Sequence, residues 1–190
     1  MPQRLSLKGR ALQLLAQREQ SRIELRRKLI RHRRSARAES VSPIGRIESG
    51  PANDIDEADG NAGALHQQEV EAMLDWLEAH RYLCAERFVE SRVHGREARY
   101  GNLRIRRELA QHGMALSEAA ARSLQETELQ RAAAVRERRF RTPPANAAER
   151  AAQSRFLLGR GFTPEVVHRL MRETQHPSVD SDSGPVEAGS

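Results

Sequence analysis

Three segments of the chain share one pattern of apolar and basic residues, and this internal repeat constrains the fold more than any other feature. The segments are IELRRKLIRHR (23–33), LRIRRELAQHG (103–113) and QSRFLLGRG (153–161). They overlay with Leu29, Leu109 and Leu157 in register, and Gly113 and Gly161 then coincide as helix ends. Each segment therefore reads as the middle helix of a recurring unit.

Each of these segments has helical periodicity before it and after it, and strand-like alternation is seen nowhere. We therefore predict an all-α fold of three tandem three-helix repeats in an elongated, curved arrangement. The chain has only four Phe, two Tyr and one Trp, so its core must consist mainly of Leu, Ala, Val and Ile. A unit of about 40 residues buries its apolar faces poorly by itself, so neighbouring repeats should stack.

Stretches rich in Gly, Pro, Ser and acidic residues interrupt the helical pattern and suggest domain boundaries. The predicted parts are a first three-helix repeat at 1–35 and 67–83, an acidic flexible insertion at 36–66, a second repeat at 84–126, a third at 127–173, and a disordered acidic tail at 174–190.

Capping signals mark several helix starts. Ser21 has Glu24 three positions later, which is a capping box, and Asn146 has the same spacing to an acid. Ser117 predicts a short Ala-rich helix that ends near Leu124, and a separate helix is expected over 127–140. The last helix is expected to begin with the cap, first-turn proline and acid of the sequence TPE at 163–165.

Trp76 flanks a helical apolar stripe formed by Val70, Met73, Leu74 and Leu77. An indole in such a position could stack on a nucleic-acid base, but it is more often a core anchor. We therefore expect Trp76 to lie in the core.

The charges are unevenly distributed. The formal net charge of the chain is +6, with +9 in residues 1–35 and +6 in 127–172, while 71–126 is neutral. The stretches at 36–70 and 173–190 are acidic. Basic helices of this kind favour a polyanion or an acidic protein groove, although many single arginines simply solvate a helix face.

Candidate contact residues lie in the basic helix 22–34 and in the elbow and helix at 96–107, where paired arginines could hold phosphates or carboxylates. The candidates for binding a partner or DNA are Arg22, Arg26, Arg27, Lys28, Arg31, Arg96, Arg99, Arg104, Arg106 and Arg107.

Motifs of catalysis are missing. The sequence has no H-x-x-x-H pair, no phosphate-binding G-x-x-x-x-G-K-[ST] loop and no G-x-S-x-G elbow. Cys84 is the only cysteine, which excludes an internal disulfide. We therefore expect a protein that is not an enzyme, uses no cofactor or metal, and is cytoplasmic, because no signal or membrane segment is evident.

One stretch and two further segments resemble a known family. The stretch contains Tyr82-Leu83, Arg87-Phe88-Val89, Tyr100-Gly101, Arg104-Ile105, Glu108-Leu109 and Gly113, and the further segments are ALQLLAQREQSRIELRRKL (11–29) and RFLLGRGFTPEVV (155–167). In order and spacing they resemble the RecX regulatory proteins over roughly residues 8–172.

This resemblance implies three-helix repeats that lodge in the helical groove of the RecA–DNA filament. There the chain would limit filament growth and lower the recombinase, ATPase and coprotease activities of RecA in DNA repair and the SOS response. It would also bind single-stranded or double-stranded DNA weakly by itself. We expect a monomer with no membrane contact.

Two other functions remain open. A RecA-independent nucleic-acid-binding helical protein would carry the same basic helices, and its affinity would fall steeply with salt. An adaptor for an acidic protein is the third alternative.

Overall fold

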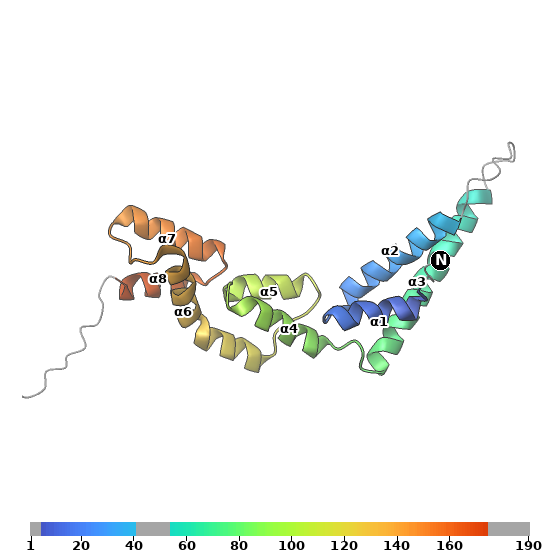
Figure 1. Cartoon of the computed structure of the whole chain (residues 1–190), viewed down its shortest axis with the longest axis horizontal. Helices are drawn as coiled ribbons and strands as arrows, with labels where there is room; N and C mark the ends of the chain where they lie inside the picture. Colours follow the sequence, from blue (N-terminus) through green and yellow to red (C-terminus); the bar gives the residue numbers. More distant parts are fainter. Residues whose placement is uncertain (1–4, 41–53, 175–190) are drawn as a thin grey trace, which may run out of the picture. The chain divides into compact units, whose positions relative to one another are not determined.

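The computed structural model describes residues 5–40 and 54–174, except for the side chains of 33, 34, 36–40 and 54–62. This part of the chain is all-helical, with no strand, which confirms the predicted fold class (Figure 1). Its helices are α1 (Leu7–Gln17), α2 (Arg22–Ser40), α3 (Asp54–Ala79), α4 (Ala85–Glu97), α5 (Asn102–Ala110), α6 (Glu118–Phe140), α7 (Ala147–Gly159) and α8 (Pro164–Glu173).

The chain divides into two compact units. Unit 1 contains residues 1–92 and 109–115, and unit 2 contains 93–108 and 116–190. Each of α4 and α5 is thus divided between the units: the first part of α4 and the last residues of α5 belong to unit 1, and the remainder of both helices belongs to unit 2.

Unit 1 is built on α1, α2 and α3, which pack against one another (Figure 1). Each helix contributes small or branched apolar residues from one face, as the periodicity requires. The buried residues of this core are Ala11, Leu14, Leu25, Leu29, Val70, Leu74, Leu77 and Leu83. Trp76 is half-buried and packs against the core, so its prediction as a core anchor is only partly correct.

The turn after α5 is attached to the start of α2 inside unit 1. Ser21 caps α2 as predicted, since its Oγ accepts a hydrogen bond of 3.1 Å from the Glu24 amide. The same Oγ lies 2.9 Å from His112 Nδ1, and the His112 ring packs edge-on against buried Phe88. One polar contact and one aromatic contact therefore fix this turn.

Unit 2 has its core between α6, α7 and α8, which contact one another in pairs (Figure 1). Pro164 is the first residue of α8, as predicted, and Asn146 Oδ1 caps α7 by accepting from the Glu149 amide at 2.9 Å. The buried core residues are Ala132, Val135, Leu157, Phe162, Val167, Leu170 and Met171.

The repeat overlay predicted that Gly113 and Gly161 end their helices, and the structure confirms it. Their φ angles are +69° and +83°, which L-residues rarely adopt. In both places the amide that follows donates back five residues, from Met114 to Leu109 O at 3.0 Å and from Phe162 to Leu157 O. This pattern is the Schellman helix end.

The elbow before α5 lies directly on the turn between α7 and α8 in unit 2. The Gly101 amide donates to Arg160 O at 3.1 Å, and the Leu103 amide donates to Gly161 O at 3.0 Å. A Cβ atom added to Gly101 would lie 2.2 Å from Phe162 Cα, so only glycine allows this approach. Two turns distant in sequence are thereby joined through their backbones.

Glu128 of α6 stabilises this contact between the elbow and the turn that joins α7 to α8. Its carboxylate is 1% exposed and accepts hydrogen bonds from the Asn102 amide at 3.0 Å and the Thr163 amide at 3.1 Å. It also accepts from the Asn102 side-chain amide and the Thr163 hydroxyl. One carboxylate therefore caps both α5 and α8, where the positive ends of the helix dipoles favour an anion. Thr163 was expected to cap α8 itself, but its hydroxyl bonds to Glu128 instead.

The predicted flexible insertion at 36–66 is wrong at both of its ends. α2 continues to Ser40, and α3 begins at Asp54, so only 41–53 of this insertion lies outside the described residues. An established helix propagates at little cost per residue, and α3 is anchored by the packing of its second half. Gly60 and Gly63 lower helix propensity without preventing the helix.

The predicted break between 124 and 127 is also wrong, because α6 is continuous from Glu118 to Phe140. The intervening Gln125 and Glu126 are good helix formers, and no Gly or Pro interrupts them. The Thr127 hydroxyl donates to Ser123 O at 2.9 Å within the helix rather than starting a new one. The repeat boundary expected at 126/127 thus falls inside one helix.

We predict that Gly101→Ala destabilises the protein by about 2 kcal/mol or more, because the new methyl group would overlap the Phe162 backbone. Gly95→Ala is the matched control, because Gly95 lies in the same unit as Gly101 and a Cβ atom added to it would meet nothing within 4 Å. It should be neutral or should stabilise α4 by up to about 1 kcal/mol. Urea unfolding measures both, and equal effects of the two changes would refute the close approach.

We also predict that His112 makes folding pH-dependent. Burial and the charges of Arg92, Arg18 and Arg27 lower the pKa of His112, against the opposing effect of Glu24. The imidazole of His112 therefore binds a proton more readily in the unfolded chain. The free energy of unfolding should fall as the pH drops below the pKa of histidine in the unfolded chain, about 6.5. Urea unfolding between about pH 7.5 and pH 5.5 should show a shallower dependence for His112→Gln than for the unchanged chain. Identical slopes would contradict this role.

Candidate functional site

Arg22, at the start of α2, faces inward to α3. Its guanidinium group pairs with Glu71 at 2.8 Å, Asp75 at 2.7 Å and Glu78 at 2.7 Å. Partial burial works to lower the pKa of Arg22, but its hydrogen bonds to Asp75 and Glu71 outweigh burial and raise that pKa. Arg22 thus has a structural role inside unit 1.

Arg26 and Lys28 of α2 also have partners within unit 1. Arg26 Nε pairs with Glu71, and hydrogen bonds from Arg26 and then Arg22 lower the pKa of this carboxyl. Lys28 Nζ donates to Gln20 Oε1 at 2.9 Å and lies 3.4 Å from Glu24. These predicted contact residues are already paired in the free protein.

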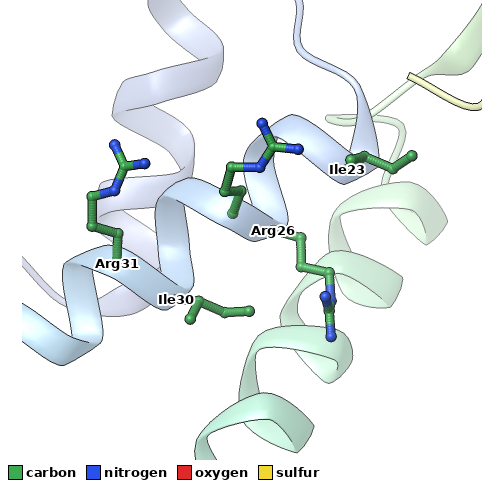
Figure 2. A pocket seen from close by; sticks show the side chains of 5 residues that line it. Ile23, Arg26, Ile30 and Arg31 are labelled. Atoms are coloured by element: carbon green, nitrogen blue, oxygen red, sulfur yellow. The ribbon is translucent and has the colours of Figure 1, made fainter. Parts of the chain in front are cut away.

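The outer side of α2 forms a groove with both apolar and basic walls. The residues that line this basic groove are Ile23, Arg26, Arg27, Ile30 and Arg31 (Figure 2). Ile23 is 41% exposed, and Arg27 and Arg31 are exposed. Among the described residues, no carboxylate pairs with Arg27 or Arg31. The groove therefore combines two apolar side chains with the charges of Arg27 and Arg31, which no described carboxylate neutralises, and with Arg26, which is paired with Glu71.

The elbow in unit 2 gathers three guanidinium groups around one tyrosine ring. We call Tyr100, Arg96, Arg104 and Arg160 the Tyr100 cluster. The guanidinium carbons of Arg104, Arg160 and Arg96 lie 4.2, 5.6 and 5.7 Å from the ring centroid, within the reach of cation–π attraction.

One carboxylate partly neutralises the Tyr100 cluster. Glu108 accepts from Arg96 at 2.9 Å and from Arg104 at 3.4 Å. Arg96 and Arg104 share this one acid, and among the described residues no carboxylate pairs with Arg160, so positive charge remains in excess. An anion could therefore still bind here.

Three further predicted residues lie on the exposed surface of unit 2. Arg99, Arg106 and Arg107 are exposed, and none has a carboxylate partner within the part of the chain that the structure describes. The ten candidates thus divide into five that are paired internally and five that are exposed and have no acid partner among the described residues. The exposed five are Arg27, Arg31, Arg99, Arg106 and Arg107.

Arg160 and Arg131 were missed by sequence reasoning. Arg160 comes to Tyr100 only because the two turns meet. Arg131 donates to Tyr100 O at 3.0 Å, Glu97 O at 3.2 Å and Asn102 Oδ1, and burial lowers its pKa. No local pattern marks these residues, because their partners lie about 30 to 60 positions away in the sequence.

No three His, Cys, Asp or Glu side chains in the described residues come together as a metal site would require. Likewise, no described helix is long and apolar enough to cross a membrane. The described part of the chain is helical, and its exposed features include two basic surfaces, the groove on α2 and the Tyr100 cluster.

Comparison with known proteins gives the family. The family model of the third three-helix domain of RecX matches residues 126–171. The chain is 46% identical to the regulatory protein RecX of Ralstonia nicotianae, over 95% of both chains. It is 41% identical to that of Ralstonia pickettii, again over 95% of both, and 42% identical to that of Herbaspirillum seropedicae, over 94% of this chain and 95% of the relative. The chain belongs to the RecX family of regulatory proteins.

We predict that the two kinds of arginine on α2 differ in their effect on stability. Arg22→Met should destabilise by about 1 kcal/mol, because it leaves Asp75 and Glu78 of α3 without the guanidinium that pairs with them, while Glu71 keeps only Arg26. Arg27→Met should change stability by no more than about 0.5 kcal/mol. Thermal unfolding at low and high salt measures both, and the Arg22 effect should shrink at high salt. An equal loss of stability in both variants would refute the division of the α2 arginines into a structural and an exposed kind.

Proposed function

We propose that this protein binds the RecA–DNA filament and regulates RecA, mostly by inhibiting its recombinase, ATPase and coprotease activities in DNA repair and the SOS response. The proposal extends the RecX family membership to a specific partner. It is carried by the five exposed arginines that have no acid partner in the described part of the chain, because a filament of protein and DNA presents an acidic, phosphate-rich surface.

The basic groove offers the best-defined contact. Ile23 and Ile30 supply apolar surface beside Arg27 and Arg31, so the groove can hold an acidic segment that also buries an apolar side chain. The Tyr100 cluster in unit 2 supplies a second basic surface. We assign Arg22, Arg26 and Lys28 to holding α2 in place rather than to binding.

The protein would act by binding alone, as a regulator in the cytoplasm without catalysis of its own. In support, its relatives are named regulatory proteins.

A second candidate is nucleic-acid binding without RecA. The observation that favours it is the Tyr100 cluster, because arginines around an aromatic ring also suit a phosphate backbone and a base. Its affinity for single strands would fall by about 0.7 log units per log unit of salt for each phosphate neutralised. RecA would add nothing to that binding.

The test measures ATP hydrolysis by RecA on single-stranded DNA with increasing amounts of the protein. We predict that hydrolysis falls at stoichiometric amounts, and that the double variant Arg27→Glu/Arg31→Glu requires about tenfold more protein. Arg122→Glu is the matched control, because Arg122 is also exposed but lies on α6, outside both basic surfaces. It should inhibit as the unchanged chain does.

Co-sedimentation with preformed filaments and with naked DNA separates the two candidates. Stronger binding to filaments supports the RecA partner, whereas equal binding supports the second candidate. Unchanged ATP hydrolysis at stoichiometric amounts would refute the proposal.

A further inference from the structure

An aromatic stack lies where α3 ends in unit 1. The rings of His80 and Tyr82 lie roughly parallel to that of Trp76, with centroids at 4.1 and 5.7 Å and interplanar angles of 26° and 17°. Lys8 of α1 places its Nζ 3.8 Å from the centroid of the Trp76 ring. We call these four side chains the Trp76 stack.

The Trp76 stack is open to solvent on its outer part. Trp76 is half-buried against the unit 1 core, but Tyr82 is 48% exposed and His80 is exposed. Neither exposed ring is needed to fill the core. Their accessible ring surface therefore remains available to another planar group.

The backbone holds these rings in position. Arg81 has a φ of +58°, a conformation that costs a non-glycine residue about 1 kcal/mol. This bend lets the Tyr82 amide donate to Leu77 O at 2.9 Å, while Arg87 donates to the Tyr82 carbonyl at 3.2 Å. His80 Nδ1 lies 2.8 Å from Trp76 O. The stack is thus formed in advance of any ligand.

Two cations, Lys8 and Arg81, lie at or beside the stack, and the nearby acids share Arg22 with Glu71. Asp75 and Glu78 are close to Trp76 in sequence, but both carboxylates pair with Arg22 at 2.7 Å. Lys8 is the charged group over the indole ring, and exposed Arg81 lies between the two exposed aromatic residues in sequence. The matching ligand is flat, aromatic and negatively charged.

We propose that the Trp76 stack is a binding site for an unpaired base of a single-stranded nucleic acid. The base extends the stack on the exposed rings of Tyr82 and His80, and Lys8 contacts an adjacent phosphate. Aromatic rings beside cations bind single strands in this way without sequence preference, because every base has a π face. The site is separate from the basic groove and requires no RecA, so it goes beyond the proposed function.

The chain carries its own reporter, because Trp76 is its only tryptophan. The experiment titrates the full chain with a thymidine oligonucleotide and follows Trp76 fluorescence. An abasic oligonucleotide of equal length supplies the same phosphates without bases, and a blunt duplex supplies bases that are already stacked. We expect saturable quenching by the thymidine strand, and binding of the abasic strand and the duplex at least about fivefold weaker. Equal quenching by all three, or none by the single strand, would overturn the site.

Substitutions at Tyr82 locate the contact. Tyr82→Leu removes the ring but keeps apolar bulk, and it should weaken binding of the thymidine strand about fivefold or more. Tyr82→Phe is the matched control, because it keeps the ring, and it should bind as the unchanged chain does. Dye-labelled oligonucleotide anisotropy provides the affinity, and circular dichroism checks that each variant is folded. Equal affinity of a folded Tyr82→Leu variant would overturn the proposal.

Lys8→Gln provides a second variant on a different helix. It should reduce affinity and also the salt dependence of binding, since one phosphate contact is lost. An unchanged salt slope would refute the contact assigned to Lys8. All these titrations omit RecA, so their failure leaves the RecA proposal standing, and loss of RecA inhibition leaves this site standing.

Discussion

The buried carboxylate of Glu128 is the interaction on which unit 2 depends. It accepts from the first amide of α5, at Asn102, and from the amide of Thr163, the residue before α8, and so connects α6 to α5 and α8 at one point. A carboxylate removed from water costs several kcal/mol unless such donors surround it. Arg131 lies beside it and bonds to carbonyls of the elbow. Because the elbow is held in this way, Tyr100 and its arginines have a fixed place.

The arginines of this chain divide between structure and surface according to which acids lie opposite them. Arg22 meets three carboxylates on α3, while Arg27, only five positions later on the same helix, meets none among the described residues. Helix geometry explains the division, since five residues rotate a side chain by about 140° around the axis. A basic helix can therefore hold its own unit together on one face and present charge to a partner on the other.

Local signals in the sequence predicted much of the helical framework. Capping by Ser21 and Asn146 and the glycine ends at Gly113 and Gly161 were all readable, because each depends on residues within five positions. The insertion and the break before Thr127 were misread, because charge and apparent breaks in periodicity say little about whether a helix continues. The nine candidate arginines and Lys28 could be named but not sorted, since the acids that pair with Arg22, Arg26 and Arg96 lie on other helices.

The sequence by itself determined an all-helical chain, the kind of residue in its core, most of the helix caps and the resemblance to RecX proteins. These properties follow from spacing and composition along the chain. Only the tertiary structure decided that Gly101 meets Phe162, that Arg160 joins Tyr100 and that Tyr82 stacks near Trp76. Except for the last, these contacts join residues far apart in sequence, and all of them depend on how the backbone turns.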